Sequence, residues 1–386
     1  MTTVFRFLPL ALALAFSLAS CGRQDSAAGD TVKIGMAAPL TGSQSDIGLD
    51  IQRGTQLGID DLNAQGLEIN GRKLKFELLS EDDEANPAKA TTVAQKLVDA
   101  KVVAVVGHFN SGASIPASKI YADAGIPQVS PGSTAPRYTQ QGYATTFRVV
   151  ANDDQQGPAA ASFLVHSLKA KKVAIIDDST AYGQGLASTF EAAVKAAGVE
   201  VVAHEHTTDK DTDFAAILTK IKGKQPEYLF FGGIYSQGAP MAKQMKALGL
   251  DVPLIGGDGI QTPKFIEVAG AAAEGSYASI PGLPKDQMPG GKAFLEKFQA
   301  RYNKQVELFA PMGYDAVFVL AEAMKRAGST EPAKVLPELK KTRYNGVIGP
   351  IEFDDKGDLK NGPITINVVK NGKWETRDVV MPGGAK

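Results

Sequence analysis

Small polar residues follow two of the strands expected in the first half of the chain. Ser111 opens a helix directly after one buried strand, and Gly132, Ser133 and Thr134 form a tight turn after the next. Hydroxyls and backbone N–H groups at helix starts and turns are well suited to bind a carboxylate. Each of these residues could also serve only as a helix cap or a turn residue.

The second half of the chain offers a complementary charge. Tyr182 follows the strand expected at 173–178, and Asp258 follows the strand expected at 252–257. Ligands in open parallel sheets bind beyond the carboxyl ends of the strands, so these side chains should share one cleft with the earlier hydroxyls. A carboxylate on one side and hydroxyls on the other suit a zwitterion bound between two lobes.

Motifs for catalysis or metal binding are weaker. No G-x-S-x-G elbow or phosphate loop occurs, and the glycines of "YGQGLAS" stand too far from their strand for a dinucleotide fingerprint. His204 and His206 would lie on one face of a strand, but no third ligand stands near them in the sequence. A solvated edge strand is the favoured interpretation, and we expect no metal, no cofactor and no enzymatic activity.

The pattern of elements predicts an α/β protein. Short β-rich runs such as "VVAVVG" at 102–107 alternate with helical patterns such as "YGQGLASTFEAAVKAAG" at 182–198. Such a series forms a parallel sheet with helices on both faces. A second series of this kind begins after Arg148. The prolines and the glycine of "SIPGLPKD" at 279–286 interrupt it. We therefore predict two similar doubly wound lobes joined by a multi-segment hinge, the first from 31–150 and 282–362 and the second from 151–281 and 363–386.

The N-terminal segment predicts export and a lipid anchor. Residues 7–19 are apolar except for Ser17, and "LASC" places Cys21, the only cysteine of the chain, after small residues. This pattern is typical of a lipoprotein signal peptide at 1–20, whose cut site leaves a cysteine to be acylated. A plain signal peptide with an incidental cysteine is the alternative. The polar stretch "CGRQDSAAGD" at 21–30 reads as a flexible tether.

The amino-acid composition limits the kinds of molecule that the chain is expected to bind. The 386 residues carry 41 Lys and Arg against 42 Asp and Glu, with a net charge of −1 and no basic block. Nucleic acid is therefore a poor partner. No later run approaches the roughly 18 apolar residues that a membrane helix requires. We expect a monomer, in the periplasm or on the cell surface, held to the membrane through lipidated Cys21.

Several segments together resemble a known family. The chain is similar to leucine–isoleucine–valine binding proteins, which are type I periplasmic binding proteins of ABC transporters. The resemblance covers nearly all of the chain after the tether. It is carried by "VKIGMAAPLTGSQSDIG", "VVGHFNSGASIPASKIYADAGIPQVSPGSTAP", "DDQQGPAAASFL", "AYGQG", "GGDG" and "GVIGPIEFDDKGDLK".

The resemblance implies a role for each candidate residue. Ser111 and Thr134 would bind the ligand carboxylate together with the backbone of Gly132 and Ser133. Asp258 would bind the ammonium group, with Tyr182 approaching from the second lobe. The side-chain pocket would be lined by three further residues, Ile47, Ile234 and Tyr235.

The sequence also departs from the family. Aliphatic Ile47 and Ile234 stand where aromatic residues are frequent, and Asp258 stands where a glutamate is frequent. An apolar amino acid delivered to a membrane permease is the function that the resemblance implies. The absence of Arg or Lys from the binding motifs disfavours glutamate or aspartate as the ligand. The alternatives are a sensor of the same fold that binds an amide or small carboxylate and, more remotely, an exported enzyme.

Overall fold

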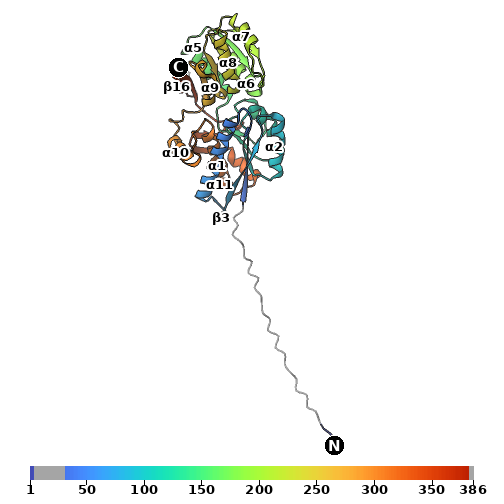
Figure 1. The fold of residues 1–386 in the computed structure, drawn as a ribbon. Helices are drawn as coiled ribbons and strands as arrows, with labels where there is room; N and C mark the ends of the chain where they lie inside the picture. The colour runs from blue at the N-terminus through green and yellow to red at the C-terminus, as the bar shows by residue number, and fades with distance from the viewer. Residues whose placement is uncertain (4–30, 382–386) are drawn as a thin grey trace.

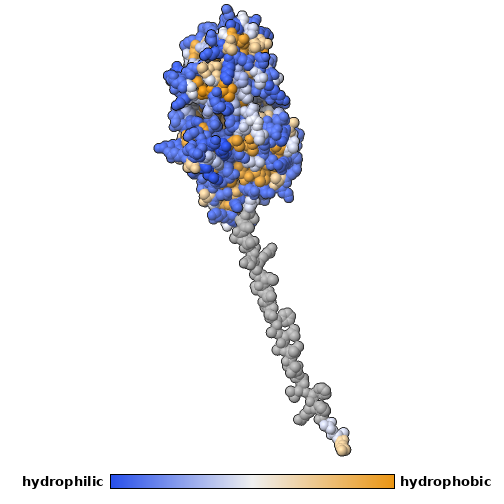
Figure 2. All heavy atoms as spheres, viewed as in Figure 1, coloured by the Kyte–Doolittle hydropathy of each residue, from blue (hydrophilic) through white to orange (hydrophobic). Residues whose placement is uncertain are grey.

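The protein is described by a computed structural model that covers residues 1–3 and 31–381. Two lobes lie end to end (Figure 1). The predicted signal peptide beyond residue 3, Cys21 and the predicted tether lie outside the described residues. No helix in the described part is both long and apolar enough to span a membrane. The face of the two lobes in Figure 2 is mostly hydrophilic, with scattered hydrophobic residues.

The first lobe is built on a five-stranded parallel sheet in the order β4-β1-β5-β6-β7. Its central strand β5 is buried along its whole length, as expected for a sheet covered on both faces. The strands are β1 (Thr31–Ala38), β4 (Lys75–Asp82), β5 (Ala104–Gly107), β6 (Gln128–Ser130) and β7 (Thr146–Arg148). The helices between them are α1 (Ser45–Gln65), α2 (Pro87–Asp99), α3 (Ser111–Asp123) and α4 (Arg137–Gln140), and β2 (Glu68–Ile69) pairs with β3 (Arg72–Lys73).

A later stretch of the chain returns to this lobe. Helix α11 packs along α1, and its apolar residues join Val32 and Ile34 of β1 in one core. Asp50 of α1 fixes the start of α11, because its carboxylate accepts backbone N–H groups from residues 307–310. The returning elements are α10 (Gly291–Tyr302), α11 (Ala310–Ala327), α12 (Pro332–Leu339), β13 (Arg343–Gly346) and β14 (Gly349–Glu352).

The second lobe has a mixed seven-stranded sheet in the order β16-β15-β12-β11-β10-β8-β9. Five strands run parallel, and the last two of the chain join antiparallel. The strands are β8 (Lys172–Asp177), β9 (Glu200–His206), β10 (Tyr228–Gly232), β11 (Leu254–Gly256), β12 (Tyr277–Pro281), β15 (Ile364–Lys370) and β16 (Lys373–Val380). The helices are α5 (Asp153–His166), α6 (Ala181–Ala196), α7 (Ala215–Lys222), α8 (Tyr235–Ala247) and α9 (Pro263–Ala269), with short 3₁₀ turns η1 (Asp258–Ile260) and η2 (Gly270–Ala273).

The structure adds two strands of the main sheets, β7 and β12, and the short β2–β3 pair to the expected pattern. Neither β7 nor β12 was predicted, because β7 has only three residues and β12 ends in the proline of "SIPGLPKD". Its parallel pairing with β11 and antiparallel pairing with β15 stabilise β12 where the local sequence gives little signal. The chain crosses between the sheets at 149–152, 282–290 and 353–363, and the residue-level lobe boundaries given above stay a prediction.

Candidate ligand-binding site

A small cavity with about 210 Å³ of empty space lies between the lobes. Part of this space is open to solvent, and the cavity is smaller than the roughly 300–1,000 Å³ typical of small-molecule sites. Three larger hollows are each lined by residues of a single lobe, and none of the described residues that line them is a buried charged side chain. The cavity is lined by five predicted residues, Ser111, Gly132, Tyr182, Ile234 and Asp258, and by two residues that were not predicted, Phe109 and Asn110.

The first lobe presents a helix start and a hydroxyl to the cleft. Ser111 is the first residue of α3, where backbone N–H groups and the helix dipole favour an anion. Its Oγ accepts the N–H of Ala135 at 3.1 Å, which ties the helix to the turn after β6. The Oγ1 of Thr134 in that turn is buried without a hydrogen-bond partner among the described residues. Burial raises the pKa of the Asp153 carboxyl, and the Thr134 hydroxyl lies close enough to offset part of this rise. Thr134 does not line the cavity itself, so its predicted contact with a ligand carboxylate stays a prediction.

The neighbouring residues of the turn have structural contacts instead. Ser133 donates its Oγ to the carbonyl of Phe109 at 2.9 Å, and its N–H donates to Ser130 Oγ at 2.8 Å. The N–H of Gly132 also points to Ser130 Oγ, at 3.3 Å. A Cβ on Gly132 would lie 2.4 Å from the Phe109 ring, so only glycine lets this aromatic residue pack over the turn. Ser133 therefore shapes the turn, while Gly132 makes room for Phe109 in the cavity wall.

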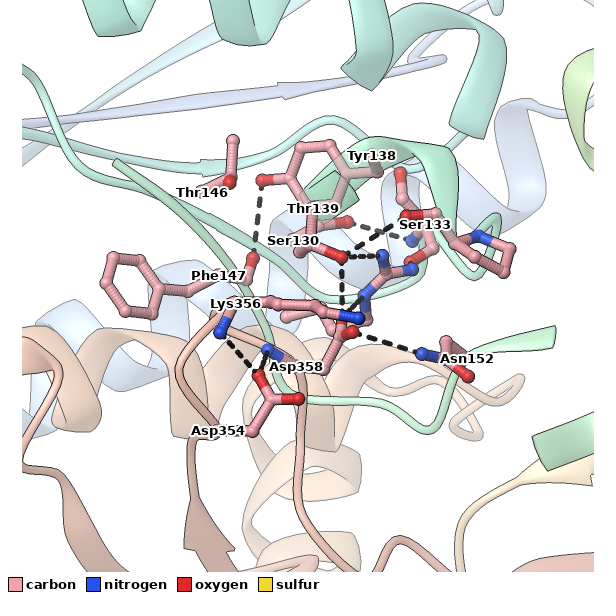
Figure 3. Close-up of polar contacts among 12 residues, drawn as sticks. Ser130, Ser133, Tyr138, Thr139, Thr146, Phe147, Asn152, Asp354, Lys356 and Asp358 are labelled. Atoms are coloured by element: carbon pink, nitrogen blue, oxygen red, sulfur yellow. Dashed lines mark hydrogen bonds and ion pairs between the residues drawn. The ribbon is translucent and has the colours of Figure 1, made fainter. Parts of the chain in front are cut away.

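Arg148 stabilises this turn by hydrogen bonds to its backbone. The side chain is fully buried, and its guanidinium donates to the carbonyls of Ser133 at 2.7 Å and Ala135 at 3.0 Å. Its Nε donates to Asp358 Oδ1 at 2.6 Å. Asn152, the N-cap residue of α5, donates to the other oxygen of Asp358 at 3.2 Å (Figure 3). One buried ion pair thus joins the binding turn to two of the segments that cross between the lobes.

The second lobe presents a buried carboxylate. Asp258 stands at the start of η1, and its Oδ1 accepts from Tyr182 Oη at 2.9 Å and Gln156 Nε2 at 2.8 Å. The Tyr182 hydroxyl in turn accepts the N–H of Gly259 at 3.1 Å. Burial raises the pKa of Asp258 to about 6, although the hydrogen bonds from Gln156 and Tyr182 lower it. Tyr182 therefore contacts the acidic group and orients it.

Asp153 adds a second acidic group that sequence analysis missed. It is the first residue of α5, it is fully buried, and its Oδ2 has no hydrogen-bond partner in the described chain. Burial, and next the charge of nearby Asp258, raise the pKa of Asp153 well above its usual range. Two acidic groups buried together are stabilised by an added cation. The signal was present, since "NDDQQG" opens a helix directly after a crossing between the lobes.

The predicted apolar residues lie close by, with different roles. Ile47 and Ile234 are buried in one cluster with Phe109 and Tyr182, and only Ile234 lines the cavity itself. Tyr235 is engaged elsewhere, because its hydroxyl donates to the carbonyl of Ser43 at 2.6 Å and also contacts Asp46. Since Tyr235 begins α8 and Ser43 precedes α1, this contact joins the two lobes at the edge of the cleft.

Comparisons with known proteins agree with this arrangement. Residues 31–373 match the family model described as periplasmic binding protein. The chain is 40% identical over 352 residues to an amino acid binding protein of Pseudomonas aeruginosa, covering 90% of this chain and 92% of that one. It is 35% identical over 342 residues to the leucine-, isoleucine-, valine-, threonine- and alanine-binding protein of the same organism, covering 88% and 90%.

A solved structure is similar along the whole described chain. The branched-chain amino acid transporter substrate binding protein LivJ from Streptococcus pneumoniae, in complex with isoleucine, aligns with a TM-score of 0.83 and 33% identity. The match covers 91% of this chain and all of that one. The predicted α/β fold with two lobes is thereby confirmed.

The buried ion pair of Arg148 generates the first prediction. Arg148→Met keeps a long side chain but leaves Asp358 without its charge partner and two carbonyls without donors. We expect the free energy of unfolding, measured by urea denaturation, to fall by about 3–5 kcal/mol. The matched control is Arg301→Met, which removes an exposed pair with Asp60 and should cost no more than about 1 kcal/mol. Equal losses in both variants would contradict the proposed importance of Arg148.

Proposed function

The chain belongs to the periplasmic binding protein family, and we propose that it binds an apolar, branched-chain amino acid between its lobes for an ABC transporter. Because the family consists of solute-binding proteins, the prediction that the chain is not an enzyme is confirmed. The observation that carries the proposal is the buried acid Asp258 in the wall of the cavity between the lobes, with a second buried acid, Asp153, close to it and bonded through its N–H to the carbonyl of Thr134.

The two halves of the cleft match the two charges of an amino acid. The start of α3 and Thr134 would bind the carboxylate, since helix N-termini and hydroxyls stabilise anions. Asp258 and Asp153 would bind the ammonium group, since a cation relieves the repulsion between two buried carboxylates. Closure of the lobes on such a ligand would complete hydrogen bonds that neither lobe satisfies alone, and the closed form is what a permease would recognise.

The side-chain pocket favours an apolar ligand. Ile234 and Phe109 line the cavity, and Ile47 packs in the same cluster. Among the residues that the structure describes, no Lys or Arg lines the cavity to bind a second carboxylate. An aliphatic side chain of the leucine, isoleucine or valine type would bury its surface there, at about 0.8 kcal/mol for each methylene group.

A ligand screen tests the function. We expect leucine, isoleucine or valine to raise the melting temperature of the chain from Gly22 onward and to bind in calorimetry. Isoamylamine lacks the carboxylate of leucine and 4-methylpentanoate lacks its ammonium, so each should bind at least about 100-fold more weakly because buried polar groups stay unpaired. A response to amides or simple carboxylates and to no amino acid would overturn the proposal and favour a sensor.

Two variants connect the screen to the cleft. Thr134→Val and Asp258→Asn should each weaken amino-acid binding by tenfold or more, which is about 1.4 kcal/mol at room temperature. Thr145→Val is a matched control, because Thr145 is a buried threonine of the same lobe whose hydroxyl also has no hydrogen-bond partner among the described residues, whereas Thr134 lies against Asp153, whose N–H donates to its carbonyl at 2.9 Å. Normal binding by both cleft variants would show that the ligand sits elsewhere.

The pKa of Asp258 predicts how binding depends on pH. The folded, ligand-free protein holds this proton up to about pH 6, whereas an unfolded aspartate releases it near 3.8. Asp258 therefore stabilises the ligand-free fold below pH 3.8, and this contribution is lost as the pH rises through about 6. An ammonium group binds the ionised form, so the association constant should be roughly tenfold higher at pH 7 than at pH 5. Calorimetry across this range should show a flatter profile for Asp258→Asn, and affinity that falls with rising pH would contradict the model.

Cys21 provides the proposed membrane attachment. The sequence "LASC" supports cleavage before this residue and acylation of its thiol, which would hold the two lobes at the membrane surface in the periplasm or outside the cell. A tether of polar residues would let the lobes reach a permease. We propose that the mature protein acts as a monomer.

Fractionation of cells tests the anchor. The wild-type chain should sediment with membranes and incorporate a labelled fatty acid, because an acylated N-terminus partitions into lipid. Cys21→Ser should incorporate none and leave the membrane fraction, while Ser20→Ala, which changes the neighbouring residue and keeps the thiol, should behave as the wild type. A wild-type protein that carries no fatty acid would exclude the anchor.

A further inference from the structure

A cluster of two histidines and one aspartate lies in the second lobe, away from the residues that line the cavity. His204 and His206 belong to β9, which is an edge strand of its sheet, as sequence analysis expected. No third metal ligand stands near them in the sequence, but the folded chain places Asp177 beside them. Asp177 ends the neighbouring strand β8 and is in register with His206. Because His204 and His206 are two residues apart, both imidazoles project from the same face of β9.

The three side chains converge on one point. Asp177 Oδ2 lies 2.8 Å from His204 Nε2 and 2.7 Å from His206 Nδ1. One ligand atom from each residue lies within 4.8 Å of the other two. Donor atoms around one tetrahedral zinc ion are about 3.3 Å apart, given bond lengths near 2.0–2.1 Å. The two distances from Asp177 would therefore lengthen by about 0.5–0.6 Å to reach this spacing, while the two histidine donors already lie within 4.8 Å of each other.

The surrounding residues orient two of these ligands. Glu191 of α6 lies 2.8 Å from His204 Nδ1 and so directs Nε2 of this imidazole toward Asp177. A carboxylate behind a metal-binding histidine is a recurring arrangement that fixes the ring and strengthens its donor nitrogen. The other oxygen of Asp177 accepts the N–H of Ser179 at 2.9 Å, which fixes the carboxylate.

The cluster has one buried side and one open side. The side chain of Asp177 is 1% exposed, that of His204 is 21% exposed and that of His206 is 61% exposed. An ion could therefore reach the site from solvent and keep a water molecule as its fourth ligand. Two imidazoles, one carboxylate and water form a donor set that suits zinc and related divalent ions rather than Ca²⁺ or Mg²⁺.

We propose that Asp177, His204 and His206 form a binding site for a divalent transition-metal ion, with Zn²⁺ as the representative ion. Glu191 is a positioning residue that contacts His204 and does not contact the metal. Binding displaces the protons that now join the imidazoles to Asp177 and replaces those hydrogen bonds with three bonds to the ion. The proposal shares no side chain with the amino-acid site, so either one can fail while the other holds.

Metal titration tests the site. The full chain, purified in detergent and stripped with EDTA, is titrated with Zn²⁺ alone by calorimetry and with Co²⁺ by visible absorption. We expect one ion per chain and a Co²⁺ spectrum with the intense visible bands of four-coordinate geometry. Binding of no ion at micromolar to tens of micromolar protein would overturn the proposal.

Single substitutions test which side chains bind the metal ion. His206→Asn and His204→Asn should each weaken Zn²⁺ binding by at least tenfold, and Glu191→Gln should weaken it by about 10–100-fold through loss of ring orientation. His166→Asn is the matched control, because His166 is an exposed histidine of the same lobe outside the cluster. It should bind Zn²⁺ as the wild type does. Undiminished binding in both β9 variants, or an equal loss in His166→Asn, would show adventitious binding and overturn the proposal.

Amino-acid binding by the same preparations provides a check on folding. His206 is mostly exposed, so its asparagine variant should keep wild-type amino-acid affinity while losing the metal. Loss of metal binding together with amino-acid binding in His206→Asn would indicate a general structural defect and contradict the assigned role.

Discussion

The buried guanidinium of Arg148 is the constraint on which the cleft depends. It donates to the carbonyls of Ser133 and Ala135, so the polypeptide between them must turn around it. Thr134 lies in that turn, next to Gly132 in the cavity wall. A charge buried this deeply requires a partner, and Asp358 supplies it from a segment 210 positions later in the chain. A lysine has the same charge but lacks the planar fork that holds several acceptors at once.

The same ion pair sits where the chain passes between the lobes. Asn152 caps α5 and binds Asp358, and the backbone N–H of Arg148 donates to the carbonyl of Gly357 at 3.0 Å. Gly357 has φ near +92°, and a Cβ there would lie 2.0 Å from the carbonyl of Thr146, so no other residue fits this approach. Two crossing segments are thus fastened together at the base of the binding turn. A motion of one lobe against the other that keeps these bonds must therefore leave the turn at Ser133–Ala135 and both segments attached to one another.

Local features of the site could be predicted from sequence, whereas long-range contacts could not. Ser111, Thr134 and Asp258 each stand within four residues of the end of a strand, so strand-then-turn patterns were sufficient to predict where they lie, and Ser111 and Asp258 do line the cavity. Asp358 could not be paired with Arg148 in this way, because nothing in a single sequence states which distant segments meet. The cluster of Asp177 with His206 shows the same limit, since it depends on which strand lies beside β9. Ser133 shows that a position in the predicted turn does not by itself indicate a contact with the ligand. Its hydroxyl donates to the carbonyl of Phe109 inside the lobe.

The backbone turn after β8 lies next to both proposed sites, the metal site and the second-lobe side of the amino-acid site. Asp177 and Asp178 are consecutive, and successive side chains of a strand point to opposite faces. Asp177 faces the histidines of β9, whereas Asp178 accepts from the backbone N–H of Thr180 at 3.0 Å and packs near Gly183 and Gly233. Thr180 caps α6, whose second residue, Tyr182, holds Asp258 in the cleft. A metal at Asp177 and an amino acid at Asp258 would therefore share one turn of backbone but no ligand atom. Asp178 and Thr180 fix the backbone between these two positions through hydrogen bonds of their own, which use neither Asp177 nor Asp258.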